Sequence, residues 1–275
     1  MIQCPICHKT KTNLQENRLN LYRCNNCSHT FTIIPKEKQE HYGDDYFLKT
    51  HKNWFENPNY PLFEFIYSEL SKLVSNKKIK ILDVGCGKGD FLKYIATKNS
   101  TYKLFGIDLI DNQHPSIYFI KGDFLEEKFE TKFDVIFSFM VVEHIDKPHL
   151  FIQKINNSLQ PGGFVFISTI NNDSFMHRIA RMLNKVGIHT AHDRLYSHHH
   201  IQHYTNKSLR TLMVMNGFDI LWEKKHNYPI KAVDVPESNF LIEKMNKFLV
   251  WLIFLASEPF GYGMLQTILC RRKGQ

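Results

Sequence analysis

Residues 79–89 read IKILDVGCGKG, and this stretch decides the fold. It opens as a short β-rich run, and a helical pattern over residues 90–98 begins directly after the glycines. Gly85, Gly87 and Gly89 carry no Cβ atom, so a ligand can approach the backbone of this turn closely. Backbone amides at the start of a helix favour an anionic or polar group. A strand, a glycine turn and a helix in this order therefore predict a ligand site at the carboxyl end of the strand.

The spacing of the glycines bears on the kind of ligand. The dinucleotide fingerprint GxGxxG would need its third glycine at position 90, where this chain has Asp90. Asp83, two residues before the first glycine, would repel a pyrophosphate and would attract an ammonium group. The turn therefore favours a ligand that carries an ammonium group over a dinucleotide.

Strand and helix patterns alternate on both sides of this turn. Helical spacing is found over residues 59–74, 90–98, 147–159 and 206–216. Further strands are expected over residues 102–108, 117–120, 133–139, 164–170, 218–223 and 264–270. This alternation predicts an α/β fold with a parallel, doubly wound sheet of the Rossmann-like kind.

Acidic residues end the next two predicted strands. Asp108 follows the glycine turn by about 20 residues, where an acid can accept hydrogen bonds from both ribose hydroxyls. Asp123 ends the third strand and could accept from an adenine amino group, with Phe124 packed on or near the ring. Each acid alone could instead be a loop cap or turn former. Together with the glycine turn they lie at one sheet edge, the edge where open α/β sheets bind ligands.

Four of the six cysteines form two CxxC pairs, Cys4 with Cys7 and Cys24 with Cys27. Two such knuckles separated by sixteen residues are a strong zinc signature, and the intervening segment is long enough for a short hairpin. A redox CxxC or unrelated buried cysteines would not explain two pairs. Residues 1–36 are therefore predicted to be a zinc ribbon, with a structural zinc because four thiolates leave no open position.

Composition excludes several other classes of protein. The 275 residues are 43% hydrophobic and 23% charged, which is typical of a globular chain. No signal peptide is readable, and the longest apolar run has nine residues (248–256), against roughly 20 for a spanning helix. We therefore expect a cytoplasmic protein without a transmembrane segment. The formal net charge of +8 favours anionic partners without choosing among them.

The chain resembles the class I S-adenosylmethionine-dependent methyltransferases, in particular the group with ubiquinone-pathway O-methyltransferases and sugar methyltransferases. The resemblance rests on ILDVGCGKGDFL, GID, KGDF, FDVIFSFMVVEHI and LQPGGFVFIST, in this order. The cysteine ribbon and the Tyr-rich residues 41–47 resemble the zinc-binding arm of sugar C-methyltransferases. The resemblance implies S-adenosyl-L-methionine as the cofactor, bound by the glycine turn, Asp83, Asp108, Asp123 and Phe124.

The resemblance also suggests catalytic residues. In the family, a Glu-His pair such as Glu143-His144 lies beside the methyl group, and His144 would remove a proton from the acceptor. The alternative is a pair that caps and packs a helix start. The family also carries a His-x-x-His-aromatic-Thr stretch, which matches residues 200–205 and makes His200 and His203 candidates for the acceptor site. A second metal site in this histidine-rich, loop-like region is conceivable but lacks clear ligand spacing.

The resulting domain plan has three parts. After the ribbon, residues 37–58 are a linker or a cover over the site, and residues 59–275 are the methyltransferase domain. A helical insertion is expected near residues 226–262. Its strongly apolar stretch 240–256 is interpreted as a core or cap helix, or as an interfacial helix that gives access to a lipid-linked acceptor.

Three functions remain open on the sequence. The favoured one is methylation of a small molecule or glycan precursor, free or linked to a lipid or nucleotide, at oxygen or carbon. The second is an RNA methyltransferase whose ribbon binds nucleic acid, but residues 138–140 read SFM where an Asn-Pro-Pro-Tyr-like motif would stand. The third is a non-catalytic module that keeps the cofactor fold, which the intact glycines and acids make the weakest.

Overall fold

The computed structural model describes residues 2–33, 53, 56–74, 78–196, 199–234 and 240–274. Its strands are β1 (Thr12–Glu16), β2 (Leu21–Cys24), β3 (Thr30–Thr32), β4 (Lys80–Val84), β5 (Lys103–Asp108), β6 (Ile117–Lys121), β7 (Phe133–Phe139), β8 (Leu159–Ile170), β9 (Gln202–His203), β10 (Phe218–His226) and β11 (Leu265–Arg272). Its helices are α2 (Tyr60–Leu73), α3 (Asp90–Lys98), α4 (Pro148–Ser158), α5 (Phe175–Lys185), α6 (Thr190–Leu195), α7 (Asn206–Met215) and α8 (Phe240–Ser257), with 3-10 turns η3 (Val142–His144) and η4 (Ile230–Ala232).

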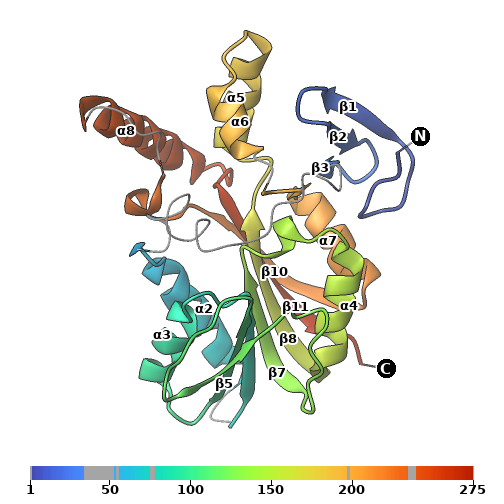
Figure 1. Ribbon diagram of the computed structural model, residues 1–275, viewed down its shortest axis with the longest axis vertical. Helices are drawn as coiled ribbons and strands as arrows, with labels where there is room; N and C mark the ends of the chain where they lie inside the picture. Colours follow the sequence, from blue (N-terminus) through green and yellow to red (C-terminus); the bar gives the residue numbers. More distant parts are fainter. Residues whose placement is uncertain are drawn as a thin grey trace.

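A seven-stranded sheet forms the body, in the order β10-β11-β8-β7-β4-β5-β6 (Figure 1). The pairs from β8 to β6 are all parallel, which confirms the predicted α/β fold. One strand departs from the parallel arrangement, because β11 is antiparallel to both β8 and β10. The chain enters β11 from the insertion after β10, at the same sheet edge, and therefore runs back in the opposite direction.

Apolar residues of β4 alternate between the two faces of the sheet, as expected for a strand buried on both sides. Ile81 packs in the core cluster with α2 and α3, whereas Leu82 and Val84 pack in the cluster with α4 and α7. Helices α2 and α3 therefore cover one face of the sheet, and α4 and α7 cover the other (Figure 1).

Most predicted elements form within a few residues of the expected bounds, and α3 and β7 match them fully. Strand β8 begins at Leu159, five residues before the predicted start at 164, and runs through the Pro-Gly-Gly sequence at 161–163. Gly162 has φ +73°, and the β7–β8 register shifts there, so the extra residues are accommodated as an irregularity. The loop expected around residues 189–203 contains α6 and β9.

The predicted hairpin between the cysteine knuckles is present as β1 and β2, and β3 pairs with β2. The two-residue strand β9 adds to β3, with Thr30 opposite His203 and Phe31 opposite Gln202. Backbone hydrogen bonds therefore join the ribbon to a segment that lies far along the chain. On the other side of the ribbon, Arg18 makes a bidentate ion pair with Asp193 of α6 at 2.6 and 2.7 Å.

The insertion after β10 holds the long helix α8, so the predicted apolar helix is confirmed as a helix. Its interpretation as a buried cap is not, because only Phe254 and Ser257 are buried. None of the helices in the described ranges is both long and apolar enough to cross a membrane. The predicted linker or cover at 37–58 lies outside the described residues, except for Asn53 and residues 56–58.

Candidate active site

A cavity of about 670 Å³ opens at the carboxyl ends of β4, β5, β6 and β7. Its volume is in the range of small-molecule sites, and its walls are mostly apolar with a few convergent polar groups. Most residues singled out by the sequence line it, namely Asp83, Gly85, Gly87, Asp108, Asp123, Phe124, His144 and His200. Three do not, namely Gly89, Glu143 and His203.

Two glycines of the turn are required by close packing. Gly85 has φ +73°, and a Cβ there would lie 2.2 Å from Cγ2 of Val141. Gly89 has the same φ and is the N-cap of α3, and a Cβ there would lie 2.6 Å from Cζ of Phe119. Gly89 therefore shapes the turn by packing against the sheet, whereas Gly85 lets the backbone face the cavity.

The carboxylates beside the turn have distinct environments. Asp108 accepts hydrogen bonds from the backbone amides of Gly87 at 2.7 Å and Ile110 at 3.2 Å, so it holds the turn against the end of β5. Asp123 accepts from the amide of Leu125 at 2.8 Å. Asp83 is almost fully buried, and burial, with the nearby charge of Asp108, raises the pKa of its carboxyl well above the ordinary value. Such a group gains from a cationic ligand, which would supply the missing counter-charge.

Phe124 forms part of an apolar wall on the β6 side of the cavity. Its ring packs edge-on against Phe151 of α4, with the centroids 5.5 Å apart. Leu125 and Ile145 complete this wall. A flat apolar group could bind there, beside the carboxylate of Asp123.

Glu143 and His144 point into different surroundings from the short turn η3. Glu143 is fully buried, and its Oε2 accepts a hydrogen bond from Thr169 at 2.8 Å, while Oε1 has no hydrogen-bond partner among the described residues. Burial raises the pKa of Glu143 to about 7. His144 lines the cavity, and its Nδ1 lies 2.7 Å from the carbonyl oxygen of His199. Because a carbonyl only accepts, the proton of the neutral ring is on Nδ1 and Nε2 is the basic nitrogen.

The two histidines of the His-x-x-His stretch have separate places. His200 lines the cavity, and its ring centroid lies 4.8 Å from that of His144. His203 lies in β9, buried, with Nε2 at 3.1 Å from Oγ1 of Thr32 in the ribbon. Its burial lowers the pKa of its imidazole well below the ordinary value. His203 therefore belongs to the junction with the ribbon, away from the cavity wall.

Several lining residues had no signal in the sequence. Met140 follows β7 with φ +59°, an uncommon conformation for a residue with a side chain, and its amide donates to Ser168 O at 2.8 Å. Arg194, Tyr228 and Asp234 come from α6 and from the insertion, and the Arg194 guanidinium donates to the backbone carbonyl of Asp234 at 3.1 Å. They lie far from any motif, so only the fold brings them to the site.

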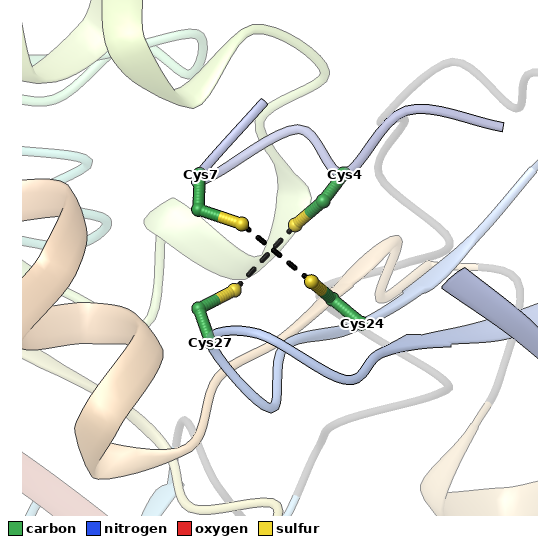
Figure 2. Close-up of side chains that lie close together, drawn as sticks. All are labelled: Cys4, Cys7, Cys24 and Cys27. Carbon is green, nitrogen blue, oxygen red and sulfur yellow. Dashed lines mark hydrogen bonds between the residues drawn. The ribbon is translucent and has the colours of Figure 1, made fainter. Parts of the chain in front are cut away.

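The four cysteines of the ribbon point toward one centre (Figure 2). The sulfur atoms of Cys4 and Cys27 are 3.6 Å apart, those of Cys7 and Cys24 are 3.5 Å apart, and all four lie within 4.8 Å of one another. In a regular tetrahedron with Zn–S bonds of about 2.3 Å, the sulfurs would be about 3.8 Å apart. The tetrad therefore fits a zinc ion in size and ligand chemistry.

The two knuckles repeat the same local geometry. The amide of Ile6 donates to the sulfur of Cys4 at 3.5 Å, and the amide of Asn26 donates to the sulfur of Cys24 at 3.4 Å. The residue after each second cysteine, His8 or Ser28, has a positive φ of 56° or 62°. Such amide–sulfur bonds orient thiolate ligands around a metal.

Comparison with known proteins agrees with this architecture. A family model described as a methyltransferase domain matches residues 59–223. The ubiquinone biosynthesis O-methyltransferase of Glaesserella parasuis is 35% identical over 109 residues, 34% of this chain and 45% of that protein. The malonyl-[acyl-carrier protein] O-methyltransferase of Calditerrivibrio nitroreducens is 32% identical over 106 residues, 38% of this chain and 43% of that protein. The chain thus matches less than half the length of these curated relatives.

A solved structure supports the fold over a longer span. It is 1,6-didemethyltoxoflavin-N1-methyltransferase of Burkholderia thailandensis, with bound 1,6-didemethyltoxoflavin and S-adenosylhomocysteine. It has a TM-score of 0.54 and 12% identity, and covers 90% of this chain and 97% of that one. At this identity the likeness shows the fold alone. Because the family model spans more than half of the chain, the chain belongs to the methyltransferase-domain family.

Proposed function

We propose that this protein transfers a methyl group from S-adenosylmethionine to a small-molecule or glycan-precursor acceptor, at oxygen or carbon. The observation that carries the proposal is one cavity with two unlike sides. One side has the glycine turn and the carboxylates of Asp83, Asp90, Asp108 and Asp123, and the other has His144, His200 and residues of the insertion. A cofactor and an acceptor can therefore meet in the same space.

The carboxylates divide the cofactor among them. Asp83 would bind the ammonium group. Burial and the nearby charge of Asp108 disfavour the ionised Asp83 carboxyl, and a bound cation would stabilise it. Asp108 would take the ribose hydroxyls, and Asp123 the adenine amino group, with the ring against Phe124. Gly85 would let the ligand approach the backbone. The volume of the cavity and the charges of these groups both fit the cofactor.

The cofactor supplies a methyl group that its sulfonium already activates, so the protein has to align the acceptor and remove its proton. His144 suits the second task because its Nδ1–H faces the His199 carbonyl and its Nε2 can accept a proton. The acceptor–CH₃ bond forms as the S–CH₃ bond breaks, and the acceptor's proton passes to Nε2. His200, 4.8 Å away between ring centroids, would position the acceptor beside it.

The acceptor side favours a polar molecule. Arg194, Tyr228 and Asp234 line it together with His200. Hydroxyl and anionic groups suit this set, and both occur in a glycan precursor linked to a nucleotide or a lipid. The named activities of the relatives, in ubiquinone biosynthesis and on a malonyl-acyl-carrier protein, are also methylations of small molecules or carrier-bound groups.

The cysteine tetrad would hold a structural zinc. The four sulfurs form a closed set with no place for a reacting water, and the site lies in the ribbon. Its contribution would be to hold β3 in place for pairing with β9, next to His200 in the chain.

Titration calorimetry with S-adenosylhomocysteine tests the proposal. We expect binding by the wild-type protein and an affinity at least about tenfold lower in Asp108→Ala, which loses both the turn contacts and the ribose acceptor. Asp219→Ala, which removes an exposed carboxylate on β10, is the matched control and should bind as the wild type does. No binding by the wild type at about millimolar ligand would overturn the proposal.

A further inference from the structure

Helix α8 presents a broad apolar surface to the solvent. Nine large apolar side chains on it are between 41% and 75% exposed, namely Phe240, Leu241, Ile242, Met245, Phe248, Leu249, Trp251, Leu252 and Leu255. Exposed apolar groups scattered singly are ordinary, but a continuous group on one helix marks a surface that another apolar phase covers.

These side chains lie on one side of the helix. At 100° per residue they fall within an arc of about 200° that runs from Phe240 to Ile242. Lys244 is the ionisable residue in this arc, and its ammonium lies 4.2 Å from the centre of the Phe240 ring. The opposite side contains Val250, Phe254 and Ser257, which face the body of the protein.

Helix α5 lies beside α8 and has exposed apolar residues of its own. It packs against α8, and both project from the same end of the molecule (Figure 1). Ile179, Met182 and Val186 are exposed on or just after α5. Its sequence, FMHRIARMLNK, contains two arginines and a lysine and no acid. An apolar ridge therefore lies beside a basic helix.

We propose that this ridge, the outer face of α8 with the exposed apolar residues of α5, docks the protein onto an anionic lipid bilayer. Helix α8 has 18 residues and would lie in the plane of the interface, with its aromatic side chains at the headgroup level. Arg178 and Lys185 of α5 would face acidic headgroups, whereas Arg181 binds inward to Asn172 and Tyr196. A second copy of the chain fits less well, because a symmetric contact would bring two basic α5 helices together.

Docking in this way would place the cavity next to the membrane. Phe254 and Val250 pack in a cluster with Leu195, Tyr228 and Met264, and these last three also line the cavity. The inner side of α8 is thus the back of the acceptor wall. An acceptor anchored in the bilayer would have a short path into the site.

Vesicle flotation with the zinc-loaded full chain tests this inference without an acceptor or any turnover. The vesicles are phosphatidylcholine alone or phosphatidylcholine with phosphatidylglycerol. The test variant is Leu241→Glu with Leu252→Glu on the ridge. The control is Leu150→Glu on α4 with Val214→Glu on α7. The side chains of Leu150 and Val214 are 51% and 49% exposed, and the two substitutions give the same change in net charge.

We expect wild type and control to float with the anionic vesicles, and the ridge variant to bind at least about tenfold more weakly. Binding of S-adenosylhomocysteine should be the same in all three, which separates this test from that of the proposed function. Brominated lipids should quench the tryptophan fluorescence of the wild-type protein more strongly than that of the Trp251→Phe variant. The inference is overturned if the wild type does not bind anionic vesicles, or if both double variants lose binding equally. It is also overturned if the wild-type protein is a dimer in solution and the ridge variant is a monomer, because the ridge would then be a contact between two copies of the chain.

Discussion

Glu143 and His144 are adjacent in the chain, yet one is sealed in the core and the other faces the cavity. A tight 3-10 turn separates the directions of their side chains. The Glu143 carboxyl is within 4.8 Å of the imidazoles of His144 and His200, so its charge state affects the site even though it does not line it. Its pKa of about 7 puts the change in charge near neutral pH.

Replacement of this carboxyl tests its buried position. The pKa of Glu143 is raised from 4.5 to about 7 in the folded state, so the fold binds the proton more tightly than the unfolded chain. Wild-type stability should therefore be lost as pH rises from about 4.5 through 7. Glu143→Gln has no carboxyl to ionise and does not show this loss. As pH rises over that range, its free energy of unfolding should therefore increase relative to that of the wild type by up to roughly 3 kcal/mol. Urea unfolding at several pH values measures the difference, and parallel curves for the two proteins would show that the carboxyl is not buried.

Histidines show the limit of prediction at this scale. The sequence placed His200 and His203 together as acceptor-site candidates, but only His200 lines the cavity. The assignment of His203 would have required knowing that β9 pairs with β3, because that pairing turns its ring toward Thr32. Asp83, Asp108 and Asp123 were easier to place, since each lies at or just beside the carboxyl end of a parallel strand and the fold brings such ends to one edge.

At the scale of elements, local patterns predicted what local forces decide. The glycine turn with α3, and the strands β5 and β7, are set by apolar periodicity and turn residues within short segments. The direction of β11 and the existence of β9 depend on partners far away in the chain, which a single sequence does not reveal. The sequence also does not reveal that α8 is exposed, because apolar periodicity predicts a helix but not whether its apolar face is covered by the rest of the protein.

The pairing of β3 with β9 connects the ribbon to the segment that carries His200, so the ribbon helps to hold this wall of the cavity in place. We expect the wild-type chain to hold about one zinc, and Cys24→Ser to hold almost none. Amide exchange should then rise at Thr32, which donates to the carbonyl of Ile201 at 2.9 Å. Metal analysis and hydrogen exchange measure both effects.

A lone buried thiol supplies the control for this experiment. Cys270 lies in β11 and is not one of the four clustered cysteines, so Cys270→Ser should keep its zinc. Affinity for S-adenosylhomocysteine should fall less in Cys24→Ser than turnover does, because β9 adjoins His200 rather than the carboxylates. A wild-type chain that binds no zinc when supplied with it would contradict the assignment of the tetrad.

For the molecule as a whole, buried histidines make stability depend on pH in the sense opposite to Glu143, and His177 and His203 are two of them. His177 in α5 and His203 in β9 lie on either side of Tyr196, where α5, α6 and the ribbon junction meet. Burial lowers the pKa of His177 to about 3 and that of His203 well below 6.5. The unfolded chain therefore takes up protons that the folded chain does not.

We expect the stability that these two histidines contribute to be fully present above about pH 6.5 and to fall as pH drops toward their folded pKa values. Each of these histidines contributes a slope of about 1.4 kcal/mol per pH unit in that range, and between pH 4.5 and 7 Glu143 contributes a slope of similar size and opposite sign. The two variants should change the pH dependence of the free energy of unfolding in opposite directions. Below about pH 6.5, His177→Gln should make the slope shallower and Glu143→Gln should make it steeper. Urea unfolding from pH 7.5 to 4.5, with zinc content followed in parallel, measures both slopes. If the two variants changed the slope in the same direction, the burial of one of these groups would be wrong.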